Sequence, residues 1–213
     1  MSTRPARSFF EVSPVALASR LMGMRLVRVL EDGTRLSGLI VETEAYCGPR
    51  DLGSHAVGGR RTPRNESMYG PAGLAYVYFT YGMHFCMNVV CGEVDEPVAV
   101  LLRALEPAEG IEIMHRQRGS LAGKGRKVTD LCSGPGKLCQ AMAIDRGLNG
   151  VDLVTSDVLF LERPDGHKAP RLQRTARIGL NNAGDWTHRP LRWLIPGNPH
   201  VSPARPPISH SRA

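Results

Sequence analysis

The sequence lacks any apolar run approaching the roughly 20 residues that a membrane-spanning helix needs. Glu11 and Arg20 interrupt the stretch in which a secretory signal would have its apolar segment. Cysteine is scarce too: the five residues are odd in number and form no CxxC pair, which favours reduced thiols over a disulfide framework. A zinc site built from Cys86, Cys91 and a histidine has poor spacing. We therefore expect no membrane segment, no metal and no cofactor.

Internal repeats, low-complexity tracts and interior linkers are also absent. The chain has 213 residues, of which 42% are hydrophobic, enough for one domain with its own core. We expect a flexible N-terminus over residues 1–8, a single domain over residues 9–202 and a disordered tail over residues 203–213.

Acidic residues are too few to balance the basic ones. The 27 Lys and Arg residues against 20 Asp and Glu give a formal charge of +7. This excess favours a polyanionic partner, nucleic acid before an anionic membrane. From charge alone, a generic basic surface explains the excess equally well.

What is present is a strand over residues 39–46 that begins in a core and ends at a surface. Apolar and polar residues alternate along it, and glycines bound it on both sides. Its end carries Glu44 and Tyr46, which place a carboxylate beside a flat stacking surface on a rigid element. Taken without context, Glu42 and Glu44 fit the solvent face of a half-buried strand better.

A β-hairpin is predicted over residues 74–90, with an apolar tip near Tyr81 and Met83. Turns usually carry Asn, Asp or Ser, so this tip fits either a wedge between base steps or packing beneath another element. The loop length decides the register. A two-residue loop puts Tyr78 and Asn88 on opposite faces, whereas a three-residue loop puts them on one face.

An apolar strand is predicted over residues 98–105, and Arg103 inside it needs a partner, for which we expect Glu44. The glycine-rich start of a helix beside Lys137 suits a phosphate, although its spacing is not that of a P-loop. The other predicted elements are helices over residues 14–22, 108–117 and 138–144 and strands over residues 25–30, 158–161, 174–180 and 191–195.

Together these stretches resemble the alkyladenine (3-methyladenine) DNA glycosylase family over roughly residues 10–200. Several long motifs in the right order are far more specific than any single short pattern. The matching motifs are His55 and residues 40–46, 58–65, 76–78, 81–83, 85–88, 101–107, 132–135, 137–141 and 177–179. The chain departs from the family pattern at His84, where we expect another aromatic, and at residues 181–182.

The resemblance implies an α+β fold: a single mixed domain with a curved antiparallel sheet, a protruding β-hairpin and surrounding helices. It implies base flipping and excision of alkylated or deaminated purines from duplex DNA, leaving an abasic site. The substrates implied are 3-methyladenine, 7-methylguanine, hypoxanthine and ethenoadenine. No lysine matches a nucleophile position, so we expect hydrolysis without a lyase step. We also expect a monomer, in the cytoplasm or nucleoid of a bacterium or the nucleus of a eukaryote.

The resemblance makes Glu44 the general base that activates water, with Arg103 and the main-chain carbonyl of Ile178 helping to hold that water. Cleavage of the N-glycosidic bond builds positive charge on the sugar, much as in glycoside hydrolysis. A carboxylate beside the sugar both deprotonates water and stabilises that charge.

The base pocket implied by the resemblance uses Tyr46, His55 and Tyr78 to sandwich the flipped base. Asn88 would crowd the exocyclic amino group of guanine and so exclude the normal base. Aromatic walls favour cationic bases and tolerate varied flat purines. A neutral leaving base such as hypoxanthine needs a proton or hydrogen-bond donor, and His55 is the nearest candidate.

The resemblance further implies that Tyr81 and Met83 occupy the gap left in the duplex. Arg60, Arg64 and Lys137 would contact the phosphate backbone. The rival hypothesis is a non-catalytic nucleic-acid-binding module that uses the same basic surface and aromatic hairpin. Both hypotheses need the hairpin and the arginines, but only the enzyme needs the carboxylate and its arginine.

Overall fold

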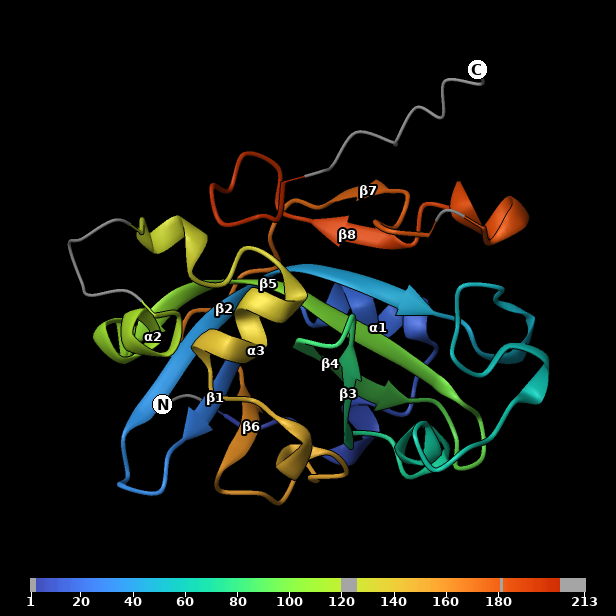
Figure 1. The fold of residues 1–213 in the computed structure, drawn as a ribbon, viewed down its shortest axis with the longest axis horizontal. Helices are drawn as coiled ribbons and strands as arrows, with labels where there is room; N and C mark the ends of the chain where they lie inside the picture. Colours follow the sequence, from blue (N-terminus) through green and yellow to red (C-terminus); the bar gives the residue numbers. More distant parts are fainter. Residues whose placement is uncertain (1–2, 120–125, 181, 204–213) are drawn as a thin grey trace.

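The structure of the chain is a computed structural model that describes residues 3–119, 126–180 and 182–203. Within these residues three α-helices surround a curled antiparallel sheet of eight strands (Figure 1), so the expected α+β class is confirmed. The helices are α1 (Pro14–Arg20), α2 (Ile111–Gln117) and α3 (Pro135–Ala141). The expected disordered tail from residue 204 onward and the departure at Asn181 lie outside the described residues.

The sheet is organised around β2 (Arg35–Tyr46), which pairs with β5 (Val98–Glu109) along one edge and with two shorter strands on the other. The strand order is β3 (Ala75–Thr80), β4 (His84–Cys91), β5, β2, β1 (Arg25–Val29) and β6 (Leu159–Glu162). The remaining pair, β7 (Gln173–Thr175) and β8 (Arg192–Leu194), joins the end of β2 through β8. Figure 1 shows β2 and β5 as the two longest arrows.

The two faces of the central strands differ in what they bury. Ala45, Val89 and Val100 share one ladder row and belong to the main core, which also includes Leu17 of α1 and Leu138 of α3. Side chains alternate between faces along a strand, so the neighbouring positions point to the other side. A second, smaller apolar cluster lies there: Ala56, Met68, Tyr69, Tyr76, Val90 and Ala99.

The start of α1 follows the prediction. The hydroxyl of Ser13 accepts a hydrogen bond from the amide of Ala16 at 3.3 Å, and Pro14 occupies the first helical position, where no donor is lost. The N-terminal segment, expected to be flexible over residues 1–8, makes defined contacts from Thr3 onward, where Thr3 pairs with Arg163. No helix among the described residues is long and apolar enough to cross a membrane.

Several predicted elements are wrong in their bounds: the helix expected over residues 138–144 is α3, which begins three residues earlier, and the strand expected over residues 98–105 continues to Glu109. The helix expected from residue 108 begins only at Ile111, because β5 continues through Pro107 and the chain turns at Gly110 with a φ of 72°. Pro107 pairs with Gly38 beside a shift in strand register, a place where a sheet tolerates a residue without an amide donor. The strand expected over residues 174–180 ends at Thr175, because Arg177 turns inward to an ion pair.

Candidate active site

One row of paired residues crosses four strands and forms the floor of the candidate site. The row is Tyr76 on β3, Asn88 on β4, Leu101 on β5 and Glu44 on β2. Paired residues point to the same face, and neighbouring strands lie about 4.8 Å apart, which puts the backbones of Glu44 and Asn88 about 10 Å apart. Tyr46 and Tyr78 follow two residues after Glu44 and Tyr76 on the same face.

Glu44 is fully buried, and polar partners surround its carboxylate. Oε1 accepts a hydrogen bond from the amide of Ile178 at 2.7 Å and lies 3.2 Å from Nη1 of Arg103. Oε2 accepts a hydrogen bond from the hydroxyl of Tyr46 at 3.1 Å. Burial, and next the charge of Glu44, raise the pKa of Tyr46 well above its usual value. The structure thus brings together Glu44, Arg103, Ile178 and Tyr46, which the resemblance assigns to the site, while their roles stay predictions.

Arg103 has the partner that the sequence predicts, and a second one. Its Nε donates to Oε1 of Glu42 at 2.8 Å, while Nη1 faces Glu44. Burial disfavours a charged guanidinium, but the two carboxylates outweigh it and raise the pKa of Arg103. Because Glu42 and Glu44 are both fully buried, the interpretation of this pair as a solvent-facing edge is wrong.

The aromatic residues form a cluster in which His55 is central. Its Nδ1 lies 2.8 Å from the hydroxyl of Tyr76, and its ring meets that of Tyr78 edge to face, with centroids 4.5 Å apart at 80°. A base between two rings needs about 7 Å, two van der Waals contacts, so none fits between His55 and Tyr78 in this arrangement. Desolvation, then the charges of Arg64 and Arg60, lower the pKa of His55 to about 4. The ring is therefore neutral at neutral pH.

Asn88 is buried at the centre of the row. Its Nδ2 donates to the carbonyl of Tyr76 at 3.1 Å, which fixes the amide across the strand pair. Tyr76 is buried within the smaller apolar cluster.

The hairpin tip has the odd loop length. Tyr78 pairs with Cys86 and Thr80 with His84, which leaves a three-residue loop from Tyr81 to Met83. The tip is open to solvent rather than packed beneath another element: Tyr81 is 84% exposed and Met83 is 69% exposed. Tyr81 also has a φ of 51°, in the left-handed region that few non-glycine residues adopt.

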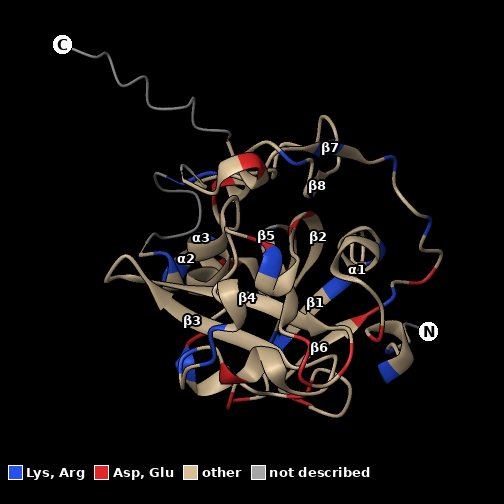
Figure 2. Cartoon of the chain, turned by 90° about the vertical axis from the view of Figure 1, so that its right-hand side faces the viewer, with Lys and Arg blue, Asp and Glu red and all other residues tan. Residues whose placement is uncertain are grey.

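The three predicted phosphate-contact residues lie around this hairpin. Nη2 of Arg64 donates to the carbonyl of Phe79 at 3.0 Å, and the charges of Arg60 and Arg64 both reach His55. Nζ of Lys137, in the first turn of α3, donates to the hydroxyl of Ser133 at 3.2 Å. Figure 2 shows Lys and Arg positions both near α2 and α3 and below β3.

A buried ion pair that the sequence did not reveal packs against Tyr46 and the main chain of β2. Nη1 and Nη2 of Arg177 donate to the two carboxylate oxygens of Asp51 at 2.6 and 2.7 Å. The guanidinium also lies 4.7 Å from the ring centroid of Tyr46, and Nη1 donates to the carbonyl of Ala45 at 3.0 Å. Because Ile178 is the next residue, the ion pair also holds its amide against Glu44. The contact between water and the main-chain carbonyl of Ile178 stays a prediction. No periodic pattern in the sequence marks Arg177, so its role is recognised only from its burial in the structure.

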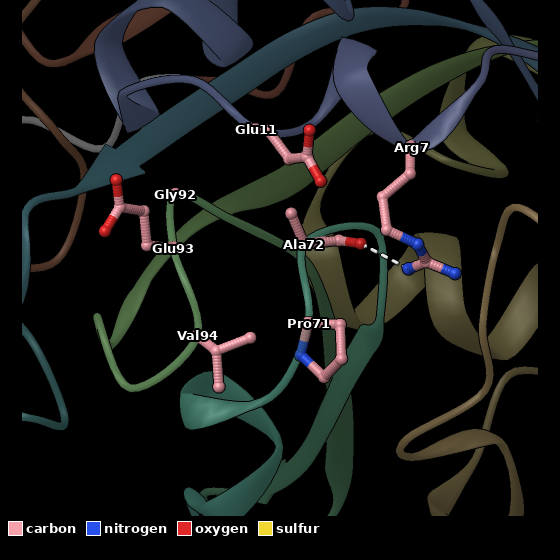
Figure 3. A pocket seen from close by; sticks show the side chains of 7 residues that line it. All are labelled: Arg7, Glu11, Pro71, Ala72, Gly92, Glu93 and Val94. Atoms are coloured by element: carbon pink, nitrogen blue, oxygen red, sulfur yellow. Dashed lines mark hydrogen bonds between the residues drawn. The ribbon is translucent and has the colours of Figure 1, made fainter.

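Neither a depression elsewhere on the surface nor the possible metal ligands among the described residues form an alternative active site. A depression of about 400 Å³ lies between the N-terminal segment and the β4–β5 turn, lined by Arg7, Glu11, Glu93 and Val94 among others (Figure 3). Arg7 is already occupied there, because its Nη1 donates to the carbonyl of Ala72 at 2.6 Å. In the part of the chain that the structure describes, no three His, Cys, Asp or Glu residues are grouped closely enough to hold a metal ion.

Comparisons with known proteins agree with this geometry. A family model described as Methylpurine-DNA glycosylase (MPG) matches residues 8–199. The chain is 48% identical over 207 residues to a mouse (Mus musculus) protein named DNA-3-methyladenine glycosylase, and 46% identical over 205 residues to the human (Homo sapiens) protein of that name. It is 44% identical over 194 residues to a protein of Natranaerobius thermophilus named putative 3-methyladenine DNA glycosylase.

These matches cover most of this chain but differing shares of the relatives. They include 94% of the chain for the mouse and human proteins and 91% for the bacterial one. They include only 62% of the mouse protein and 68% of the human protein, against 96% of the bacterial protein. The chain therefore spans less than two thirds of the length of the mouse relative.

Proposed function

Because the chain belongs to the methylpurine-DNA glycosylase family, we propose that it flips damaged purines out of duplex DNA and excises them by hydrolysis. The proposed substrates are alkylated and deaminated purines, among them 3-methyladenine, 7-methylguanine, hypoxanthine and ethenoadenine. The observation that carries the proposal is the buried carboxylate of Glu44 at the end of β2, with Arg103, Ile178 and Tyr46 in contact with it.

In the proposed reaction Glu44 takes a proton from water while the water oxygen bonds to C1′ of the sugar. The bond between C1′ and the purine nitrogen breaks, and its electron pair leaves with the base. A cationic methylated purine leaves as a neutral base. The negative charge of Glu44 also stabilises the positive charge that develops on the sugar. Arg103 and the main-chain carbonyl of Ile178 would hold the water.

The contacts between the rings suggest which residues form each wall of the pocket. His55 and Tyr78 touch edge to face, so we assign them to one composite wall, with Tyr46 opposite. Asn88, on the floor between them, would crowd the amino group of guanine. If Nδ1 of His55 accepts a hydrogen bond from the hydroxyl of Tyr76, the neutral ring carries its own proton on Nε2 and can donate a hydrogen bond from it to a neutral purine.

The proposed DNA-binding surface surrounds the hairpin. The exposed side chains of Tyr81 and Met83 suit insertion into the gap that a flipped nucleotide leaves. Arg60, Arg64 and Lys137 are proposed to neutralise phosphates on either side. We propose that the protein acts as a monomer. We also propose that its product is an intact strand with one abasic site, because no lysine is assigned as a nucleophile.

The test is single-turnover excision on a set of duplexes that each carry one of the four lesions, with hot alkali used to reveal abasic sites. Glu44→Gln should abolish excision of hypoxanthine while binding of the lesion duplex persists. Glu66→Gln, at an exposed carboxylate that pairs with Arg61, is the matched control and should excise normally. Wild-type protein that binds the duplexes without excising any lesion would instead support the non-catalytic binding module.

A further inference from the structure

Behind the candidate base lies a second buried carboxylate with no assigned role. Glu42 is fully buried and accepts four hydrogen bonds. Its Oε1 accepts from Nε of Arg103 at 2.8 Å, from Nε of Arg192 at 2.6 Å and from the hydroxyl of Ser202 at 2.8 Å. Its Oε2 accepts from the amide of Ser202 at 2.7 Å. Since three of these donors do not involve Arg103, the position of Glu42 is fixed independently of it.

Arg103 is divided between two carboxylates as a result. Its Nε contacts Glu42, and only Nη1 contacts Glu44, at 3.2 Å. A guanidinium that is free to turn prefers two parallel hydrogen bonds to one carboxylate. Such a bidentate pair with Glu44 would occupy both of its oxygens and compete with water for them.

We propose that Glu42 is a positioning residue for the excision reaction. It holds Arg103 by Nε so that the guanidinium contacts only Oε1 of Glu44, and Oε2 keeps a lone pair for water beside the hydroxyl of Tyr46. The inference rests on the proposed function, because it concerns the same base. Burial and strand position alone do not account for a charged side chain at residue 42, whereas a positioning role does.

The strand pattern makes this arrangement available. Strand pairing sets Glu42 opposite Ala104 and Thr43 opposite Leu102, so Arg103 is an extra residue in β5. Such a bulge re-aims a side chain and is common beside active sites. Arg103 thereby reaches both glutamates of β2, and Arg192, which pairs in register with Glu44, contacts Glu42 instead.

The experiment compares the single-turnover excision rate of wild type and Glu42→Gln on a hypoxanthine duplex from acid to neutral pH, together with lesion-duplex affinity. Glu42→Gln keeps the shape but removes the charge, so Arg103 can turn fully toward Glu44. We expect the excision rate to fall about 10- to 100-fold, the scale of a small misplacement at a catalytic group, while affinity is unchanged. The acid limb of the pH profile should move to lower pH, because one negative charge is lost beside the group formed by Glu44, Tyr46, Arg103 and Arg177.

The matched control is Thr43→Val. Thr43 lies between the two glutamates, is equally buried and donates to the carbonyl of Ala18 at 3.0 Å on the other side of the strand. It should lower thermal stability but leave the excision rate and pH profile near wild type. If Glu42→Gln does not fold, Glu42→Asp keeps the charge but is shorter by one methylene, and its excision rate should still fall measurably below that of the wild type.

A folded Glu42→Gln protein that excises at the wild-type rate with an unmoved pH profile would overturn the inference. So would a rate loss that Thr43→Val reproduces at equal loss of stability, or a Glu42→Asp variant with wild-type rate where only that variant folds. If wild type itself excises no lesion, the proposed function fails rather than the role of Glu42.

Discussion

Breaking the Asp51–Arg177 ion pair should destabilise the protein far more than breaking an exposed pair. Asp51→Asn keeps the side-chain shape but removes the charge that balances Arg177. Both side chains are fully buried, and the contact is bidentate at 2.6 and 2.7 Å. The carboxylate of Asp51 also accepts hydrogen bonds from the amides of Cys47 and Gly53, each at 2.9 Å. The variant therefore leaves a buried cation without its counter-charge.

The expected loss follows from that burial. Removing one partner of a buried ion pair costs about 3–5 kcal/mol, because the remaining charge is desolvated and unpaired. For a domain of this size each kcal/mol lowers the melting temperature by about 2–4 °C, so we expect a drop of roughly 6–20 °C. Glu66→Gln breaks the Arg61–Glu66 pair, whose side chains are 47% and 55% exposed, and should lower the melting temperature far less, because water already solvates both charges.

Thermal unfolding and urea unfolding of both variants, at one pH and salt concentration, measure the difference. Excision should fall as well in Asp51→Asn at temperatures where the protein remains folded. Arg177 lies against Tyr46 and immediately precedes Ile178, so loss of its anchor loosens two contacts of Glu44. A melting temperature for Asp51→Asn equal to that of Glu66→Gln would refute the reasoning from burial.

Three further predictions concern the proposed DNA-binding and base-binding residues. Tyr81→Ala should change stability by no more than about 0.5 kcal/mol, because the side chain is exposed, yet weaken lesion-duplex binding and flipping; equal affinity in both proteins would remove the wedge role. His55 should titrate near pH 4 by NMR instead of near 6.5, and stability should fall as pH drops from 6.5 to 4, because the unfolded chain takes up the proton first; a midpoint near 6.5 would contradict this. Arg60→Ala should reduce the salt dependence of DNA binding by about one unit of slope, and an unaltered slope would place Arg60 away from phosphates.

The elements that could be predicted from the sequence are those whose signals are local. The Ser13–Pro14 start of α1 depends on a cap and a proline. The three-residue hairpin loop followed from requiring Tyr78 and Asn88 on one face, and the strand pairing has that register. Two neighbouring residues determine the start of α1, whereas the sequence alone left the loop length open until Tyr78 and Asn88 were required to share one pocket.

The elements that were mispredicted depend on partners far away in the chain. Pro107 fits the start of a helix locally, yet pairing with β2 extends the strand past it to Glu109. Glu42 fits an exposed strand position until Arg192 and Ser202, at least 150 residues later, close over it. Local alternation carries no information on which later segment covers a face.

The number of buried charges at the site is larger than the stability of the fold requires. Glu44 and Arg103 alone would already form a neutral buried pair, and Glu42 with Arg192 adds a second one on the same face. Each additional buried pair has a desolvation cost that its attraction does not reliably recover, and apolar residues of similar size often stabilise as much. A second pair adjoining the first is therefore poorly explained by folding alone. It is explained if the orientation of one guanidinium matters, because a fixed carboxylate on its far side is what prevents the guanidinium from turning.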